Sequence, residues 1–306
     1  MPYDTANAFD SGTAAWIAAA RARESERVDR LFVDPFASAF AATLGRLALE
    51  ASERASGGEN QFLPIRTRFF DDALEAEADK LDQVVLLGAG FDTRAYRLSL
   101  PGELRWFEID RPEMLAEKQR ILGELGSTAR CRRSVVAADL AQSWTESLLE
   151  AGFVQGHRTA WLAEGLLFYL SAAAVANLLG EARRLSGVGS LIGADVFGSG
   201  LLTLPAVGRS VSARAGRGLP PPFTTDDPAA TFKAAGWSSV GLEYPGRLGV
   251  IYGRPFDQSA ERLTPDPTMQ SYLVVARHEG RPRSDLSRDR RSRDHVGYRC
   301  RVGAQS

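Results

Sequence analysis

Short apolar runs that alternate with helical segments constrain the fold of this chain more than any other feature of its sequence. Between residues 83 and 196 lie five such runs, rich in Ala, Val, Ile and Leu. Strands that alternate with helices pair in parallel through right-handed crossovers, so helices cover both faces of the sheet. The expected strands are residues 83–87, 104–109, 134–137, 159–163 and 191–196. The sequence therefore predicts an α/β fold around a parallel sheet.

The remaining segments predict one domain with attachments. Helices are expected at residues 5–30 (one or two), 36–49, 64–80, 94–99, 112–125, 143–151, 172–186 and 228–235, and two more strands at 239–244 and 271–276. Residues 50–61 are expected as a polar loop. Residues 198–222, rich in Gly, Ser, Arg and Pro, are expected as an insertion or lid. The apolar pattern ends after Arg277, which predicts a disordered, Arg-rich tail over residues 281–306.

Charge and cysteine content exclude several classes of protein. A net charge of −1, from 37 basic and 38 acidic residues, provides no field that would attract nucleic acid or an anionic membrane. Cys131 and Cys300 are too few for a disulfide framework, and no Cys-x-x-Cys pair indicates a metal site. The apolar run at residues 14–20 is too short for a secretory signal. We therefore expect a soluble, cytoplasmic protein without a metal.

The residues that end the predicted strands carry the functional signal, because ligands of open parallel sheets bind beyond the carboxyl ends of the strands. Gly88 and Gly90 permit a sharp turn and a close approach of backbone to a ligand. Asp110 ends the next strand, where a carboxylate can accept hydrogen bonds from ribose hydroxyls. Asp139 and Glu164 end the two strands after that. Four successive strands thus bring small or acidic residues to one edge, which predicts a nucleoside site.

The kind of nucleoside is indicated by Thr93, which stands where a dinucleotide fingerprint requires a third glycine. This favours S-adenosylmethionine, which has no pyrophosphate, over NAD or FAD. The carboxylate of its methionine part needs a cation, and Arg68, on the helix before the first strand, can supply a bidentate guanidinium. Two plainer interpretations stay open: a simple tight turn at the glycines, and an Arg68 on a solvated helix face.

Four segments carry a resemblance to a known family. They are residues 66–72 (RTRFFDD), 85–98 (VLLGAGFDTRAYRL), 106–112 (WFEIDRP) and 163–170 (AEGLLFYL). The chain resembles the leucine carboxyl methyltransferase family, and most of all its bacterial branch of candidate S-adenosylmethionine-dependent methyltransferases, some of which methylate carboxyl groups of polyketide-type metabolites. The resemblance runs from about residue 5 to residue 277.

The family resemblance implies a fold and a domain organisation. It implies a class I methyltransferase fold, in which a Rossmann-like, seven-stranded sheet is mostly parallel with an antiparallel last strand, and an added N-terminal helical part lies over the site. Residues 1–62 would be the helical lid, and residues 63–280 the S-adenosylmethionine-dependent methyltransferase domain. The tail of residues 281–306 matches nothing in the family.

The resemblance also implies roles for residues at the methionine end of the cofactor. Arg68 would hold the methionine carboxylate, and Glu164 would contact the methionine side. Gly88 and Gly90 would line the methionine and the ribose. Asp92 would either touch the cofactor or cap the following helix.

At the nucleoside end, the same resemblance assigns the ribose hydroxyls to Asp110 and the adenine to Asp139 with Leu140. The function it implies is O-methylation, most simply of a carboxyl group on a small secondary metabolite. Alternatives are a phenolic hydroxyl or the C-terminal carboxylate of a protein or peptide. A nicotinamide-dependent dehydrogenase and an inactive nucleotide-binding protein are the alternatives from other classes.

The acceptor is less well defined by the sequence, and no catalytic residue can be assigned. A carboxylate is ionised at pH 7, whereas a phenol benefits from a general base. Since no histidine ends a strand, a carboxyl acceptor is favoured. Phe168 and Tyr169 would lie either in the acceptor wall or in a helix core, and arginines of the insertion would either receive an anionic substrate or face solvent. These arginines are Arg209, Arg214 and Arg217.

Overall fold

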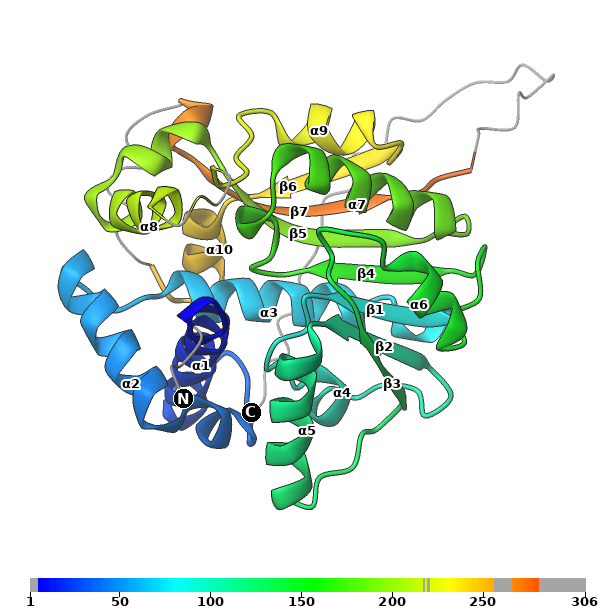
Figure 1. The fold of residues 1–306 in the computed structure, drawn as a ribbon, viewed down its shortest axis with the longest axis horizontal. Coiled ribbons are helices and arrows are strands. Elements are labelled where there is room, and N and C mark those ends of the chain that lie inside the picture. The colour runs from blue at the N-terminus through cyan, green and yellow to red at the C-terminus, as the bar shows by residue number, and fades with distance from the viewer. Residues whose placement is uncertain (1–4, 217, 219–220, 256–265, 281–306) are drawn as a thin grey trace.

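Seven strands form a single sheet in the order β3-β2-β1-β4-β5-β7-β6 in the computed structural model (Figure 1). The structure describes residues 5–216, 218, 221–255 and 266–280. The strands are β1 (Gln83–Leu87), β2 (Arg105–Asp110), β3 (Arg132–Ala137), β4 (Thr159–Ala163), β5 (Leu191–Phe197), β6 (Ser239–Glu243) and β7 (Ser271–Arg277). All pairs are parallel except those of β7, which runs antiparallel to β5 and β6. Strand order reverses at β1, which pairs with both β2 and β4, and ligands of such sheets bind at this reversal.

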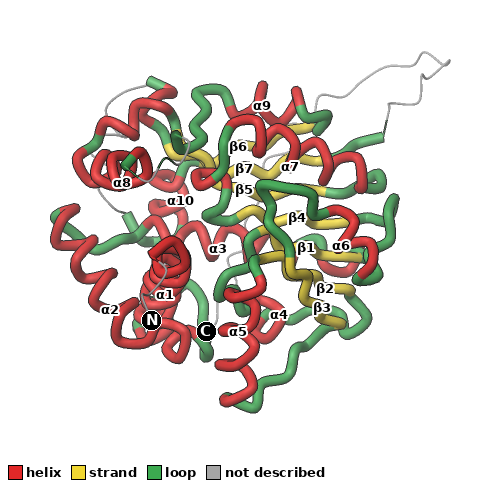
Figure 2. The backbone as a smooth tube through the Cα atoms, viewed as in Figure 1, coloured by secondary structure: helices red, strands yellow, loops and turns green. Residues whose placement is uncertain are grey.

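Helices lie on both sides of the sheet (Figure 2). The α-helices are α1 (Thr5–Glu26), α2 (Ala37–Ser56), α3 (Phe62–Glu75), α4 (Arg94–Arg97), α5 (Pro112–Glu124), α6 (Thr145–Glu150), α7 (Ala172–Leu185), α8 (Pro205–Ala215), α9 (Pro228–Ala234) and α10 (Pro245–Ile251). Short 3₁₀ helices are η1 (Ala78–Lys80), η2 (Leu167–Tyr169), η3 (Ser199–Thr203) and η4 (Pro267–Met269). No helix of the described residues is both long enough and apolar enough to cross a membrane.

Two apolar cores form because successive side chains of a strand point to opposite faces. On β1, Val84 and Leu86 belong to a core shared with α1 to α5 and α10, while Val85 and Leu87 belong to a core shared with α6, α7 and α9. All five residues of β1 are buried. A strand buried on both faces is mostly apolar, and the single polar residue of β1, Gln83, is its first.

The predicted fold class, with its seven-stranded, mostly parallel sheet and N-terminal helical part, is confirmed. The expected polar loop over residues 50–61 was wrong in its first half, because α2 continues to Ser56 and ends only at Gly57, which is left-handed at φ 76°. The expected helix to Lys80 ends at Glu75, and η1 follows. Residues 198–222 contain η3 and α8, and α10 was not anticipated. The tail of residues 281–306 lies outside the described residues.

Packing between α1 and α2 yields a stability prediction. A Cβ at Gly45, in α2, would lie 2.4 Å from the backbone oxygen of Ala15 in α1, whereas a Cβ at Gly180, in α7, would meet nothing within 4 Å. Gly45→Ala should therefore cost about 1–3 kcal/mol of unfolding free energy through overpacking. Gly180→Ala should add about 0.5–1 kcal/mol, because alanine is the better helix former. Denaturant unfolding of both variants measures this contrast, and a Gly45→Ala protein as stable as the parent would contradict the close contact.

Candidate active site

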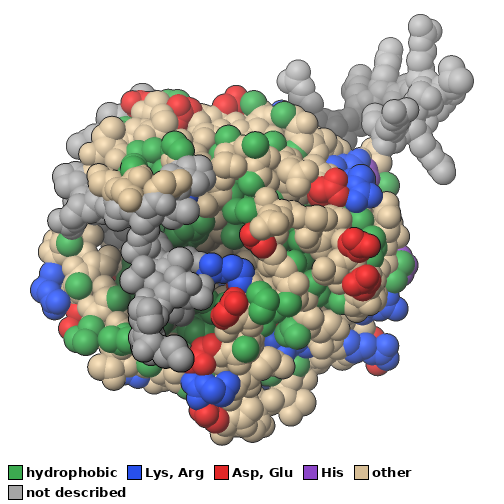
Figure 3. Space-filling model, viewed as in Figure 1, with side chains coloured by type: hydrophobic (Ala, Val, Ile, Leu, Met, Phe, Trp, Pro, Cys, Tyr) green, Lys and Arg blue, Asp and Glu red, His purple; other side chains and the backbone are tan. Residues whose placement is uncertain are grey.

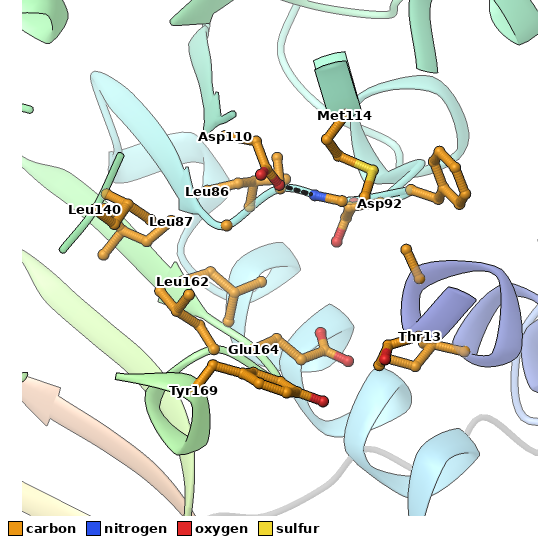
Figure 4. Close-up of a pocket in the computed structure, with 18 of the residues that line it drawn as sticks. Thr13, Leu86, Leu87, Asp92, Asp110, Met114, Leu140, Leu162, Glu164 and Tyr169 are labelled. Atoms are coloured by element: carbon orange, nitrogen blue, oxygen red, sulfur yellow. Dashed lines mark hydrogen bonds between the residues drawn. The ribbon is translucent and has the colours of Figure 1, made fainter. Parts of the chain in front are cut away.

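A cavity of about 750 Å³ lies beyond the carboxyl ends of β1 to β4. Its volume falls within the roughly 300–1,000 Å³ typical of small-molecule sites. Residues from the strand ends form its floor, and the α1 residues Thr13, Ala14, Ile17 and Arg21 line it from the side of the N-terminal helices (Figure 4). In the space-filling view, acidic and basic side chains lie side by side near the centre of the face shown (Figure 3). The cavity is thus enclosed by segments far apart in the sequence.

The turn after β1 contains two glycines in a left-handed conformation. Gly88 and Gly90 have φ of 69° and 43°, a left-handed conformation that favours glycine. The amides of Gly88 and Ala89 both donate to the carbonyl of Ile109, at 2.9 and 3.0 Å. A Cβ at Gly88 would lie 2.9 Å from Cδ1 of Leu166. The backbone conformation therefore favours glycine at both positions, and both glycines line the cavity.

Asp110 ends β2 and faces the glycine turn (Figure 4). Its Oδ2 accepts from the amide of Gly90 at 2.7 Å, and its Oδ1 from the amide of Arg111 at 2.7 Å. Burial raises the pKa of Asp110 above its ordinary value, although these two hydrogen bonds oppose the shift. Each carboxylate oxygen has a further lone pair, so Asp110 can still accept two hydrogen bonds from a ligand.

Asp139 and Leu140 follow β3 and line the same cavity. Asp139 is exposed, with Oδ1 accepting from the amide of Ala141 at 2.9 Å and Oδ2 from Nε2 of Gln142 at 3.0 Å. Leu140 is buried and lies close to Leu87 (Figure 4). An apolar side chain beside a carboxylate is a suitable wall for a planar heterocycle that also carries a donor amine.

A buried ion network begins at Glu164, which follows β4. Its Oε1 accepts from Nε of Arg66 at 3.0 Å, and its Oε2 lies 2.8 Å from Nη2 of Arg94. Arg66 also donates to Oδ2 of Asp195 on β5 at 2.9 Å, and Oδ1 of Asp195 accepts from the amide of Gly165 at 2.6 Å. Burial would raise the pKa of Glu164, but the Arg94 and Arg66 guanidiniums hold it below its ordinary value. Glu164 is therefore an ionised carboxylate in the cavity wall.

The same network continues to α3 through Arg94. Its Nε donates to Oδ1 of Asp71 at 2.6 Å, and Arg97 binds both oxygens of Asp71 at 2.6 and 2.8 Å. Arg94 also pairs with Asp92, whose Oδ1 accepts from the amide of Arg94 at 2.7 Å. Asp92 thus stabilises the start of α4 and lines the cavity as well, so its two predicted roles are compatible.

The pKa of Asp92 is set by burial and by the positive charges around it. Burial alone would raise the pKa of Asp92, but the charges of Arg94, Lys118 and Arg97 outweigh it and lower the pKa to about 2. Asp92 is therefore ionised throughout the neutral range.

The N-terminal helices are tied to the glycine turn through one carboxylate, that of Asp34. Arg21 of α1 donates to Asp34 Oδ2 at 2.8 Å and to the carbonyl of Phe91 at 2.6 Å. The hydroxyl of Thr93 also donates to Asp34 Oδ2, at 2.7 Å. Thr93 stands where a dinucleotide fingerprint has glycine, and its side chain is used to hold the covering helices.

Tyr169, in η2, lines the cavity on the side away from Asp110, with its hydroxyl directed towards Thr13 (Figure 4). Burial raises the pKa of Tyr169, and the hydrogen bond with Thr13 and the charge of Arg66 oppose that shift. The neighbouring Phe168 does not line the cavity. Arg214 of α8 does, whereas the side chains of Arg209 and Arg217 lie outside those that the structure describes.

Arg68, which was predicted to hold the methionine carboxylate, has other partners in the structure. This side chain does not line the cavity, and its Nε lies 2.8 Å from Oδ1 of Asp72 while Nη1 donates to the carbonyl of Leu31 at 2.6 Å. The physical reason is helical phase: Arg68 and Asp72 form an i,i+4 pair on the outer face of α3, and the Arg68 side chain is 42% exposed. Arg66 lies in phase with the buried Phe70 and is itself buried. The apolar periodicity of α3 places Arg66, and not Arg68, on the buried face of the helix.

The remaining predicted residues, Gly88, Gly90, Asp110, Asp139, Leu140 and Glu164, all line one cavity. Sequence reasoning missed further arginines of its wall, among them Arg21, Arg66, Arg94 and Arg97. Their partners are distant in the sequence, so local pattern alone does not reveal them. Together the residues form a site with acidic groups towards β2 and β3 and paired charges towards β4.

Comparison with solved structures supports the methyltransferase fold. A candidate methyltransferase from Thermobifida fusca has a TM-score of 0.56 at 15% identity, covering 84% of this chain and 96% of that chain. A DUF574 family protein from Streptomyces avermitilis has a TM-score of 0.54 at 19% identity, covering 85% and 96%. At these identities the similarity shows the fold alone, which is that of Rossmann-like methyltransferases.

Sequence comparison identifies the family. The pattern of the leucine carboxyl methyltransferases matches residues 14–182. A protein of Frankia alni, named as a candidate S-adenosyl-L-methionine-dependent methyltransferase, is 39% identical over 278 residues, which are 87% of this chain and 93% of that protein. A similarly named protein of Parafrankia is 48% identical over 185 residues, 58% of each. The chain belongs to the leucine carboxyl methyltransferase family, and the prediction of a methyltransferase is confirmed.

The opposite pKa shifts of Asp92 and Asp110 predict opposite pH dependences of stability. Because the pKa of Asp92 is lowered from 3.8 to about 2, its ionised form stabilises the fold by roughly 2 kcal/mol above pH 4, and this is lost as pH falls towards 2. Asp92→Asn should therefore be less stable than the parent at pH 7, and the difference should shrink on acidification. Denaturant unfolding from pH 7 to pH 3 measures it.

Asp110→Asn is the matched comparison. Because burial raises the folded-state pKa of Asp110, protonation favours the folded state, so the parent should gain stability relative to this variant as pH falls through that pKa. Parallel pH profiles for the two variants would contradict the electrostatic description of the site.

Proposed function

We propose that this cavity binds S-adenosylmethionine and that the enzyme transfers its methyl group to the carboxylate of a small molecule. One observation carries the proposal: Asp110 accepts from the amide of Gly90 across the glycine turn and keeps lone pairs free within the cavity, at the reversal of strand order. A ribose with two free hydroxyls suits this arrangement. The names of the relatives from Frankia and Parafrankia support it.

The side chains of the cavity fit the other parts of this cofactor. Asp139 can accept from the adenine amine beside Leu140. Glu164 and Asp92, both ionised, suit the ammonium group, and Arg66 or Arg94 suits the carboxylate of the methionine part. When bound, S-adenosylmethionine supplies a methyl group on a sulfonium that a nucleophile can displace.

A carboxylate acceptor agrees with the titratable groups of the wall. No histidine is among the described residues that line the cavity. Burial raises the pKa of Tyr169, which keeps its hydroxyl protonated at neutral pH, and the ionised Glu164 is engaged by Arg66 and Arg94. A carboxylate is already a nucleophile at pH 7, whereas a phenol with a pKa of about 10 requires a base. The described wall therefore favours an acceptor that needs no deprotonation.

In this proposal the protein acts mainly by positioning the two reactants and excluding water from them, and less by transferring protons. Thr13, Ala14 and Ile17 of α1 line the cavity and separate part of it from solvent. Holding donor and acceptor in line is sufficient for a displacement of this kind. Enclosure by α1 also favours a small molecule over the C-terminus of a protein, which would require an open groove.

Binding of the cofactor is tested by calorimetric titration with S-adenosylmethionine and with NAD. The parent protein should bind the first and not the second. Asp110→Asn should weaken binding at least tenfold, because hydrogen bonds to a charged acceptor contribute about 1.5–3 kcal/mol each. Arg68→Gln serves as the control and should bind normally, since Arg68 lies outside the cavity. Tight NAD binding without S-adenosylmethionine binding would overturn the proposal.

The acceptor chemistry is tested with methyl-labelled S-adenosylmethionine and a panel of aryl carboxylic acids, phenols and peptides. We expect label in products that mild alkali hydrolyses with release of labelled methanol, because methyl esters are base-labile and methyl ethers are not. Label that is stable to alkali on a phenol would reject the carboxylate acceptor while keeping the methyltransferase. Transfer to peptide C-termini alone would reject the small molecule.

A further inference from the structure

Lys118 is a buried lysine in a chain that uses arginine for almost all of its basic residues. The sequence contains three lysines against 34 arginines. The other two lysines, Lys80 and Lys233, are exposed, whereas Lys118 is 0% exposed in the middle of α5. Burial of an ammonium group is unfavourable unless the group is paired, so the charges around Lys118 indicate what it does.

Lys118 belongs to a buried cluster with two other charged side chains, Glu108 and Arg133. Its Nζ lies 2.8 Å from Oε2 of Glu108 on β2, and Nη2 of Arg133 on β3 donates to the same oxygen at 2.6 Å. Arg133 also donates to Oε1 of Gln119 at 2.8 Å and lies over the ring of Tyr96. Two cations thus share one carboxylate, which leaves the cluster with a surplus of positive charge. Glu108 would keep Arg133 as its partner if Lys118 were neutral.

This cluster lies directly behind the cavity wall. Met114 precedes Lys118 by one turn on the same face of α5, and Met114 lines the cavity whereas Lys118 does not. Figure 4 shows Met114 beside Asp110 and Asp92. Glu108 precedes Asp110 by two residues on β2, so both side chains point to the sheet face that packs on α5. Lys118 therefore approaches the acidic part of the wall from the interior of the protein.

The ionisation of Asp110 is set by groups that act in opposite directions. Burial raises its pKa, and the hydrogen bonds from the amides of Gly90 and Arg111 lower it. The charge of Lys118 lowers the pKa further, whereas that of Glu108 raises it. Lys118 therefore favours the ionised form of Asp110, which accepts hydrogen bonds more strongly than the neutral acid.

Asp92 depends less on Lys118 than Asp110 does. Burial would raise the pKa of Asp92, but the charges of Arg94, Lys118 and Arg97 lower it to about 2. Both arginines stay in place when Lys118 is replaced, so Asp92 should remain ionised at neutral and mildly acidic pH. A change in ligand binding over that pH range therefore reports on Asp110.

We propose that Lys118 is a positioning residue of the cofactor site, whose buried ammonium holds Asp110 as a carboxylate and so extends cofactor binding to mildly acidic pH. The inference rests on the proposed function, because it takes Asp110 as the group that binds the ribose. Lys118 does not line the cavity, so it acts through Asp110. Affinity for the cofactor should fall as pH drops through the pKa of Asp110, and without Lys118 that pKa should be higher.

The test is calorimetric titration of the whole protein with S-adenosylhomocysteine from about pH 8 to about pH 5. Lys118→Met keeps the length of the side chain and removes its charge. In this variant the fall in affinity should begin about one pH unit higher than in the parent, which makes binding about tenfold weaker at the acidic end. At about pH 8 the two proteins should bind alike, because Asp110 is ionised in both. Lys118→Gln is a second neutral variant and should behave in the same way.

The matched control is Lys80→Met. Lys80 also pairs with a glutamate, Glu77 at 3.3 Å, but it is exposed and does not line the cavity. This variant should reproduce the pH profile of the parent. Thermal unfolding of each variant shows whether the fold is retained.

A second measurement needs no ligand. In a double-mutant cycle of unfolding free energy with Lys118→Met and Asp110→Asn, the two positions should stabilise each other at pH 7. This interaction should weaken as pH falls and Asp110 becomes protonated. An interaction that is independent of pH would contradict the electrostatic role of Lys118.

The titrations distinguish this role from a structural one. An equal loss of affinity at every pH in Lys118→Met would overturn the inference, because it would mean that Lys118 only holds α5 on β2. An unchanged profile, or loss of the fold in both neutral variants, would overturn it as well. Failure of the parent to bind S-adenosylhomocysteine would instead count against the proposed function, and the double-mutant cycle would still decide whether Lys118 acts on Asp110.

Discussion

The rest of the site depends on a buried chain of ion pairs that runs from Asp71 through Arg94 and Glu164 to Arg66 and Asp195. It joins α3, α4, the end of β4 and β5. Removing one member would leave a buried charge without its partner, which typically costs about 3–5 kcal/mol. This constraint fixes the strand ends relative to α3, and the cavity takes its shape from that arrangement.

Much of the sheet could be predicted from the sequence because its signal is local. β1 and β4 were predicted with their observed bounds, since each is a short apolar run ended by a glycine or an acid. Gly88, Gly90, Asp110, Asp139 and Glu164 were found for the same reason: the carboxyl ends of parallel strands share one edge, so position in the chain gives position in the site. Leu140 was found through the family resemblance. The end of α2 was missed because Gly57, the signal that stops the helix, was assigned to the loop.

The arginines of the wall could not be predicted in this way. Arg94 and Arg97 follow the glycine turn in the sequence, but their partner Asp71 comes from a helix 23 residues before Arg94. The neighbouring sequence does not indicate which carboxylate each arginine pairs with. Charged side chains are seldom buried unless they are paired, so their burial could not be predicted without knowing their partners. Arg68 was predicted from its place before the first strand and from the family motif, without considering the phase of the helix that carries it.

Asp34 links the helical cover to the glycine turn in a way that has a thermodynamic consequence. One carboxylate accepts from Arg21 of α1, from Thr93 beside α4, and from the amides of Phe36 and Ala37 at 3.1 Å each, where α2 begins. The N-terminal helices and the glycine turn are therefore energetically coupled through Asp34, and such coupling acts equally in both directions. A ligand that binds at the turn would therefore stabilise the packing of the N-terminal helices on it. By linkage, that packing would raise the affinity for the ligand by the same factor.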